Sequence, residues 1–387
     1  MFNFKQYDWK KYNISLIIIV ITISVSGAFI LRMAGGAGDG PSLFKKQLAG
    51  LVLGLCIMAF VSILDYHFVC RFVILYYLAG TAMAAATKLT PLGTDLKTGS
   101  YRWLKLGINF QPSELCKIIL ILALAVFYAK FKEKTNKIYV LLLAFLITMV
   151  PTFFILIQSD LSSSMVMFFI CAVMVFAAGT SYKIILALLA IGIPGAGALL
   201  WYVQQPYQKL LDHYQYLRIF GFMNPELPEA ADIVWQQEQS IDAIASGRVY
   251  GKMILDSSDQ MRNHLRIPVS ESDFVFSVIG EELGFIGSCV LIGLLLVVIL
   301  KCLLTAKKSM DYLGMMICIG ISALFMFQVF ANIGVVTMIL PNTGLPLPFL
   351  SSGISSMLSS MISMGIVLNI GLQSGRKTHN GFSLSNL

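Results

Sequence analysis

The stretch DFVFSVIGEELGFIGSCVLIGLLLVVILKCL, residues 273–303, decides the fold of this chain. From Phe274 to Leu303 it is apolar enough to form a helix of roughly 45 Å at about 1.5 Å per residue. The hydrocarbon core of a bilayer is only about 30 Å thick. We therefore predict a membrane-spanning helix whose first turns project into the headgroup layer, with Asp273 at its outer mouth.

Each of the three carboxylates in this stretch allows two interpretations. Asp273 either caps the helix or performs chemistry at the lipid–water boundary, and one residue can do both. Glu281 and Glu282 lie about two turns deeper. A carboxylate near the membrane centre costs about 2.5–3.5 kcal/mol on insertion scales, so it usually faces a cavity or a partner. The glutamates therefore either satisfy local donors or line a polar path.

The composition indicates a polytopic membrane protein. Of 387 residues, 57% are hydrophobic and 12% are charged, whereas soluble proteins carry about 25% charged residues. We predict an all-α integral membrane protein with about ten transmembrane helices, forming a single polytopic domain, residues 1–387. The predicted spans are 13–33, 46–64, 67–87, 112–131, 137–157, 161–179, 183–203, 274–303, 311–340 and 349–373.

The distribution of lysine and arginine predicts the orientation. The short basic loops KFKEKTNK (130–137) and KCLLTAKK (301–308) are placed inside, which makes both termini cytoplasmic. The long segment 204–273, between the seventh and eighth helices, is then an extracytoplasmic loop, with an amphipathic helix expected over 232–246. The net charge of +8 is a topology signal and requires no nucleic acid to explain it.

The cysteines predict neither a disulfide framework nor a metal site. The seven cysteines lie in or beside apolar runs, and no CxxC pair is present. Zinc sites and disulfide scaffolds have recognisable cysteine spacings that are missing here. We interpret these thiols as small buried apolar groups.

The segment GSYRWLKLGINFQPSELCKIIL, residues 99–120, carries a helix start and several charges. Pro112 suits the first turn of a helix, and Ser113 with Glu114 extends that signal. Lys117 lies three residues after Glu114 and so on the same helix face. Either these two form a buried ion pair, or Lys117 joins Arg102 in binding an anionic partner.

The run LPNTGLPLPF, residues 340–349, breaks a helix at or near membrane depth. Irregular backbone is tolerated there only where protein covers it or where it lines a cavity. The serines that follow favour close helix packing; they are Ser355, Ser356, Ser359 and Ser360.

Four motifs together resemble the RodA/FtsW/SpoVE (SEDS) family in order and spacing. They are RWLKLG…QPSELCK, QSDL, SDFVFSVIGEELGFIG and NIGVV…LPNTGLPLPFLSSGISS. The resemblance covers nearly the whole chain. It implies a ten-span peptidoglycan glycosyltransferase that polymerises lipid II at the outer face of the bacterial cytoplasmic membrane. It also implies a partner, a class B penicillin-binding protein whose transpeptidase crosslinks the glycan.

The family motifs imply functional residues at matching positions. Asp273 matches the catalytic aspartate. The substrate-binding candidates are Arg102, Trp103, Gln111, Ser113, Glu114 and Lys117. To these we add Arg218 from the long segment 204–273, which we call the outer segment. The chain departs from the family where it has QSDLSS for the common QPDLGT and PVSESDF for the common PExHTDF. These departures leave open a function in elongation, division or sporulation.

The expected reaction uses one carboxylate and several cations. Asp273 would take the proton of an acceptor hydroxyl as general base, and cations would meet the leaving diphosphate. In falling order these are Arg102, Lys117, Arg218 and Arg248, and Asp273 is expected beside Lys117. One base and an activated donor imply inversion to a β-1,4 bond without a carboxylate nucleophile. A divalent cation would share the neutralisation, although no ligand cluster in the sequence identifies one.

Two other functions remain open. A flippase for the lipid-linked precursor would use intramembrane charges such as Asp160, Glu114 and Glu281 as a polar path. This chain instead concentrates its charges at the outer edge. A non-catalytic scaffold for the crosslinking partner would not require the retained Asp273.

Overall fold

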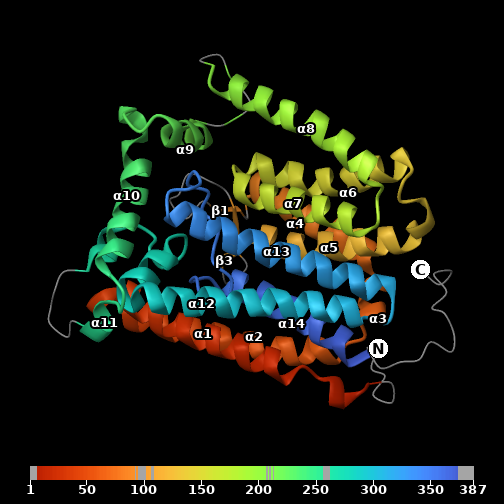
Figure 1. Cartoon of the computed structure of the whole chain (residues 1–387), viewed down its shortest axis with the longest axis horizontal. Coiled ribbons are helices and arrows are strands. Elements are labelled where there is room, and N and C mark those ends of the chain that lie inside the picture. Colours follow the sequence, from red (N-terminus) through yellow and green to blue (C-terminus); the bar gives the residue numbers. More distant parts are fainter. Residues whose placement is uncertain are drawn as a thin grey trace.

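The computed structural model describes residues 7–91, 93–94, 102–105, 109–205, 208, 211, 213–255 and 262–373. Within these ranges there are ten apolar helices, and nine of them, all but α8, form a bundle (Figure 1). Eight are long and apolar enough to cross a membrane, and α4 and α7 are apolar helices of 17 residues each. The ten are α1 (Ile14–Ala34), α2 (Gly36–Ile63), α4 (Val73–Leu89), α5 (Pro112–Lys130), α6 (Ile138–Ile157), α7 (Leu161–Ala177), α8 (Tyr182–Val203), α12 (Val275–Lys308), α13 (Tyr312–Val336) and α14 (Ile354–Gln373). The predicted all-α multi-span fold is confirmed.

Some predicted boundaries are wrong, and each error has a local cause. Helix α2 begins about ten residues before the predicted 46 because its first turns, GAGDGPSLFKK, are too polar to register as a span. The predicted span 67–87 is divided, because Asp65 caps a separate short helix, α3 (Tyr66–Arg71), before α4 begins. Helix α14 begins at Ile354 rather than 349, after a series of turns.

The long segment between α8 and α12 gathers at one end of the bundle (Figure 1). In its described part it contains α9 (His213–Met223), η4 (Pro228–Ala230), α10 (Ala231–Ser246), α11 (Lys252–Leu255) and η5 (Asn263–Arg266). Helix α10 is the amphipathic helix predicted over 232–246, and it buries Ile233 and Val234. Helix α8 is exposed along almost its whole length and lies apart from the bundle in Figure 1.

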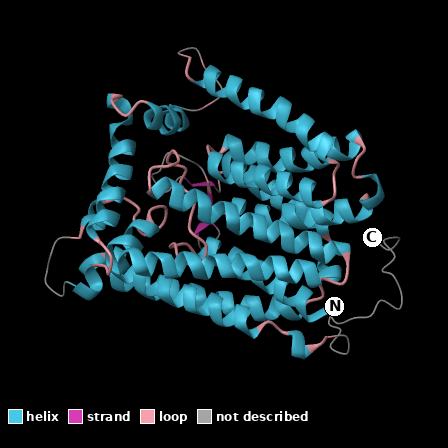
Figure 2. Ribbon diagram, in the orientation of Figure 1, coloured by secondary structure: helices cyan, strands magenta, loops and turns pink. Residues whose placement is uncertain are grey.

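A small antiparallel sheet accompanies this end (Figure 2). Its strands β1 (Gly93–Thr94), β2 (Trp103–Lys105) and β3 (Asn109–Phe110) pair in the order β1-β2-β3. Trp103 pairs with Thr94, and Leu104 pairs with Phe110. The sheet therefore fixes the segment that carries Arg102 just before α5 begins.

The opposite end brings the first and last described segments together. The N–H of Asp8, which precedes η2 (Trp9–Lys11), donates to the carbonyl of Leu372 at 3.1 Å. The first and last described segments therefore lie at the same end of the bundle, consistent with an even number of spans. Residues 1–6 and 374–387 are outside the described ranges, and the cytoplasmic placement of the termini stays a prediction.

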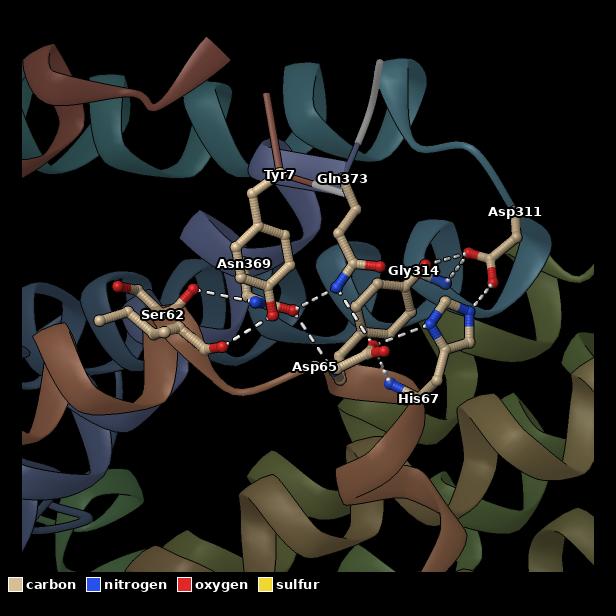
Figure 3. A network of polar contacts seen from close by, with 10 residues as sticks. Tyr7, Ser62, Asp65, His67, Asp311, Gly314, Asn369 and Gln373 are labelled. Carbon is tan, nitrogen blue, oxygen red and sulfur yellow. Dashed lines mark hydrogen bonds and ion pairs between the residues drawn. The ribbon is translucent and has the colours of Figure 1, made fainter. Parts of the chain in front are cut away.

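A half-buried polar network ties this end together (Figure 3). The imidazole of His67 lies between two carboxylates, with Nδ1 3.0 Å from Asp65 Oδ1 and Nε2 2.7 Å from Asp311 Oδ2. Gln373 donates to Asp65 at 3.1 Å, and Asp311 also caps α13 through the N–H of Gly314 at 2.8 Å. The network thereby joins the starts of α3 and α13 to the end of α14.

Helix α12 is broken at Gly284, where φ is +66° and ψ is −166°. The N–H groups freed by the break are satisfied by the outer segment, because Phe285 donates to the carbonyl of Arg248 at 2.9 Å and Ile286 to that of Val249 at 3.1 Å. A Cβ at Gly251 would lie 2.2 Å from the carbonyl oxygen of Glu282, so only glycine allows this approach. The outer segment is thus docked into the helix break.

The two glutamates of α12 complete this docking. Glu281 accepts hydrogen bonds from the backbone N–H groups of Asn263 and His264 at 2.9 and 2.8 Å, and it forms an ion pair with Lys252. Glu282 pairs with Arg262 at 2.8 Å. The interpretation that these carboxylates satisfy local donors therefore holds for the described residues.

Candidate active site

A cavity of about 260 Å³ opens where four apolar helices of the described chain begin. Helices α5, α7, α12 and α14 all start beside it, and their first residues are Pro112, Leu161, Val275 and Ile354. The N-terminus of a helix carries partial positive charge and unpaired N–H groups, so it favours anions. Convergence of these ends makes the cavity a favourable place for negative charge.

Six of the predicted catalytic and substrate-binding residues line this cavity. They are Asp273, Arg102, Trp103, Gln111, Glu114 and Arg218. Their segments lie far apart in the sequence, and the bundle brings them together. The outer segment contributes Arg218 from α9, which lies over the starts of the membrane helices.

Asp273 lies two residues before α12 and is half-buried in the cavity wall. The N-cap of α12 is Phe274 and no side chain caps it, so the interpretation of Asp273 as a helix cap is wrong. Asn332 holds this segment in place, since its Nδ2 donates to the carbonyl of Asp273 at 2.9 Å and to that of Leu345 at 2.7 Å. Burial raises the pKa of Asp273 above its usual value, and the nearby charges of Arg218 and Arg102 offset only part of that rise. A carboxylate with a raised pKa is a stronger base once it is ionised.

Asp160 is a second carboxylate in the cavity wall, and its environment differs. Its Oδ1 caps α7 by accepting from the N–H of Ser163 at 3.0 Å, and its Oδ2 accepts from the hydroxyl of Ser113 at 3.3 Å. Burial alone would raise the pKa of Asp160, but the charge of Arg102 and the bonds from Ser163 outweigh it and lower the pKa. The two aspartates therefore differ in pKa, as expected where one serves as a base and the other as a fixed charge.

Arg102 and Arg218 stand at the border between this cavity and a second, adjoining one. The second cavity has a volume of about 190 Å³ and a largely apolar lining that includes Leu161, Leu200 and Phe327. One Nη of Arg102 donates to the carbonyl of Ser159, while its Nε has no hydrogen-bond partner among the described residues. A charged cavity thus adjoins an apolar one, with arginines at the boundary.

Lys117 is not beside Asp273, so that expectation is wrong. Its Nζ lies 2.7 Å from Oε1 of Glu114, and both side chains are buried. Glu114 lines the cavity and also accepts from Ser359 at 3.2 Å, whereas Lys117 lies behind it. The ion-pair interpretation of these residues is therefore correct, and Arg218 is the cation that most lowers the pKa of Asp273.

Two other residues expected from the sequence to bind substrate, Ser113 and Arg248, lie outside the cavity wall. Ser113 acts from behind it by donating to Asp160. Arg248 has an exposed side chain, and only its carbonyl has a defined function, at the break in α12. Neither contributes to the lining of the cavity in the described part of the chain.

Asp160 and Gly344 line the cavity but were not among the predicted site residues. From the sequence Asp160 was noted only in the QSDL motif and as a charge on the alternative flippase path, although an aspartate before LeuSerSerSer at the start of an apolar run is also a helix-cap signal. No comparable sequence pattern predicts that Gly344 lies in the site. Its position depends on the loop between α13 and α14, where its φ is +69°. No group of three His, Cys, Asp or Glu side chains able to hold a metal occurs among the described residues.

Comparison with known proteins gives a consistent result over nearly the whole chain. The family model for FtsW, RodA and SpoVE, described as cell cycle protein, matches residues 10–375. The chain is 30% identical to a probable peptidoglycan glycosyltransferase FtsW of Trichlorobacter lovleyi, with 95% of this chain and 94% of the relative covered. It is 29% identical to the peptidoglycan glycosyltransferase MrdB of Escherichia coli, with 95% of each covered.

Two solved structures from the same kind of protein align with this chain over nearly its full length. A chain from a structure described as structural coordination of polymerization and crosslinking by a peptidoglycan synthase complex aligns with a TM-score of 0.76 at 26% identity, covering 96% of this chain and 99% of that one. The crystal structure of the rod shape determining protein RodA of Thermus thermophilus aligns with a TM-score of 0.68 at 25% identity, covering 96% and 98%.

Proposed function

Because this chain belongs to the FtsW/RodA/SpoVE family and is a peptidoglycan glycosyltransferase, we propose that its catalytic centre is the cavity around Asp273. The substrate is lipid II, polymerised into β-1,4 glycan at the outer face of the bacterial cytoplasmic membrane. The observation that carries the proposal is that the carboxylate of Asp273 shares a cavity with two arginines and several helix N-termini.

Asp273 acts as the general base in this proposal. Its carboxylate takes the proton of the sugar 4-hydroxyl as that oxygen attacks the anomeric carbon of the donor. Burial favours the base, because a raised pKa increases the proton affinity of the carboxylate at neutral pH. Asp160 is occupied in capping α7 and binding Ser113, and Glu114 is paired with Lys117. A single base therefore remains, which supports inversion rather than a covalent intermediate.

Arg102 and Arg218 neutralise the leaving diphosphate. Planar guanidinium groups bind phosphate oxygens through paired hydrogen bonds, and the helix N-termini add positive potential. The adjoining apolar cavity suits the lipid carrier attached to that diphosphate. The sugar and peptide portions of the substrate are bound by Glu114, Gln111 and Trp103. Two residues behind the cavity wall hold its carboxylates in position: Ser113 holds Asp160, and Lys117 holds Glu114.

A divalent cation would share the neutralisation of charge, but the described residues do not fit one well. No group of three ligating side chains is assembled among them. We therefore assign the neutralisation to the two arginines.

A flippase is less well supported than a polymerase. The intramembrane carboxylates of the described chain are locally satisfied: Glu114 by Lys117, Glu281 by Lys252 and His264, and Glu282 by Arg262. A path across the bilayer would need charges spread through its depth. A scaffold is also less well supported, because a scaffold does not need a base inside an anion-attracting cavity.

The partner is proposed to be a class B penicillin-binding protein that crosslinks the product. A related chain that aligns over 96% of this one comes from a peptidoglycan synthase complex that couples polymerization and crosslinking. The outer segment around α9–α11 supports this, because it is docked onto α12 close to the cavity and is the largest described region outside the helices of the bundle.

The decisive experiment gives purified protein, with its partner, fluorescent lipid II in proteoliposomes. Wild-type protein should form long glycan strands on a gel, and Asp273→Asn should form none. Asp242→Asn, which removes an exposed carboxylate from α10 at the same end, is the matched control and should polymerise normally. Polymerisation by Asp273→Asn at the wild-type rate, or lipid II flipping without polymer in the wild type, would overturn the proposal.

A further inference from the structure

A groove of about 700 Å³ lies at the opposite end of the bundle from the catalytic cavity. It is formed by η2, the start of α1, the last turns of α12 and the end of α14. Among the described residues four lysines line it: Lys10, Lys11, Lys301 and Lys308. The proposed polymerase chemistry makes no use of this groove.

The groove carries a strong excess of positive charge. Asp8 Oδ2 lies 3.9 Å from Nζ of Lys11, and both side chains are 40% or more exposed. An exposed pair of this kind contributes little binding free energy. Lys301 donates to the hydroxyl of Ser15 at 2.7 Å. Lys10, Lys301 and Lys308 form no ion pair with any described carboxylate, so a bound anion would relieve the repulsion among them.

The surroundings indicate the depth of the groove in the membrane. Trp9 is 53% exposed, and its ring centroid lies 6.2 Å from that of Tyr12. Tryptophan and tyrosine concentrate at the level of the lipid headgroups. The lysines that flank these rings therefore lie at headgroup level.

Leu304 lines the groove, and further exposed apolar side chains lie along the two helices that border it. On α12, Leu300, Leu303 and Leu304 are 46%, 42% and 54% exposed, and on α1, Ile14 and Ile18 are 61% and 58% exposed. A soluble phosphate would have no use for this apolar surface. A phospholipid would place its phosphate among the lysines and its acyl chains along these residues.

We propose that this groove is a binding site for an anionic phospholipid, with the headgroup phosphate held by Lys10, Lys301 and Lys308. The lipid would bridge η2, α12 and α14. Helix α12 carries this groove at one end and begins two residues after Asp273 at the other. The bound lipid would therefore hold the far end of the helix on which the active site depends.

The test uses the purified full chain in detergent and native mass spectrometry. Phosphatidylglycerol should remain bound where phosphatidylcholine of the same acyl composition does not. The double variant Lys301→Gln/Lys308→Gln should bind phosphatidylglycerol about thirtyfold more weakly. The matched control, Lys130→Gln/Lys134→Gln, removes the same charge from exposed residues at the same end of the bundle, outside the groove, and should bind as the wild type does.

Several outcomes would overturn the proposal. Equal retention of both lipids would show that charge does not select the ligand. Equal loss in both double variants would show a general effect of net charge. Displacement of the lipid by glycerol phosphate at the same concentration would assign the site to a soluble phosphate. A single symmetric peak in size-exclusion chromatography and a wild-type thermal midpoint in lipid-free detergent check that both double variants remain folded, so a loss of binding is not a loss of structure.

Discussion

Gly344 faces the carboxylate of Asp273 so closely that a Cβ on Gly344 would lie 2.8 Å from Oδ2 of Asp273. The same Cβ would lie 3.2 Å from Nη1 of Arg218. Asn332 fixes this arrangement from behind by donating to the carbonyls on both sides, those of Asp273 and Leu345. The irregular loop between α13 and α14 therefore leaves open the space between base and cation where the reacting groups would sit.

Gly344→Ala should abolish most polymerisation while the protein remains folded. The new methyl group would occupy the space beside Asp273, and a side chain at a φ of +69° costs about 1–2 kcal/mol. We expect a loss of at least roughly tenfold in kcat/KM, equivalent to about 1.4 kcal/mol. Gly179→Ala is the matched control, because Gly179 has a φ of +82° but nothing within 4 Å of its Cβ position. Equal loss in both variants would attribute the effect to backbone strain alone.

The Glu114–Lys117 pair should behave as a unit. Lys117→Met leaves a buried carboxylate unpaired and should lower the free energy of unfolding by about 3–5 kcal/mol. The double variant Glu114→Gln/Lys117→Met should recover most of that stability, since no charge is left unpaired. Thermal unfolding in detergent measures the effect. Additive losses in the double-mutant cycle would contradict the pairing and would return Lys117 to direct contact with the substrate.

Glu281→Gln should loosen the outer segment while the membrane bundle stays intact. The carboxylate holds two backbone N–H groups, the ring of His264 and Lys252. An amide cannot compensate the charge of Lys252, so the segment should become sensitive to limited proteolysis near residue 263. Glu238→Gln, on the exposed face of α10, is the control and should stay resistant. If Glu281→Gln resists proteolysis as the wild type does, the backbone hydrogen bonds at the Gly284 break are sufficient to hold the outer segment, and Glu281 is not required.

The pH dependence of stability should report on His67. Burial alone would lower the pKa of His67, but its bonds to Asp311 and Asp65 outweigh that and raise the pKa to about 9. The folded pKa therefore exceeds the unfolded value of about 6.5. The stabilisation, at most about 3 kcal/mol, is fully present below about pH 6.5 and is lost as the pH rises toward 9. The thermal midpoint of the wild type should fall over this pH range, while that of His67→Gln should stay nearly level. If the two midpoints fall in parallel with pH, protonation of His67 is not the source of the stability change.

The sequence predicted the helices better than the site, for a physical reason. Apolar runs such as 137–157 report membrane insertion directly, so each predicted span overlaps an observed helix. Contacts across the bundle leave no such local pattern. Lys117 could be paired with Glu114 from their spacing of three residues, but the approach of Arg218 to Asp273 depends on how α9 folds over the bundle. The break at Gly284 was missed because the residues that satisfy it lie in a different segment.

The acid limb of the pH–rate profile should depend on Arg218. Burial raises the pKa of Asp273, and Arg218 is the largest of the influences that lower it. Polymerisation should therefore fall as the pH drops through the pKa of Asp273, because the base becomes protonated. In Arg218→Gln that fall should begin at higher pH, in addition to any loss in rate from weaker binding of the diphosphate.

The control for this prediction is Arg248→Gln. Arg248 was a candidate cation from the sequence, but its side chain is exposed and does not line the cavity. Its profile should match that of the wild type, because the backbone carbonyl that satisfies α12 is unchanged by the substitution. An unshifted acid limb in Arg218→Gln, measured as kcat/KM for lipid II across the pH range, would separate Arg218 from Asp273 and leave Arg102 as the cation that tunes the base.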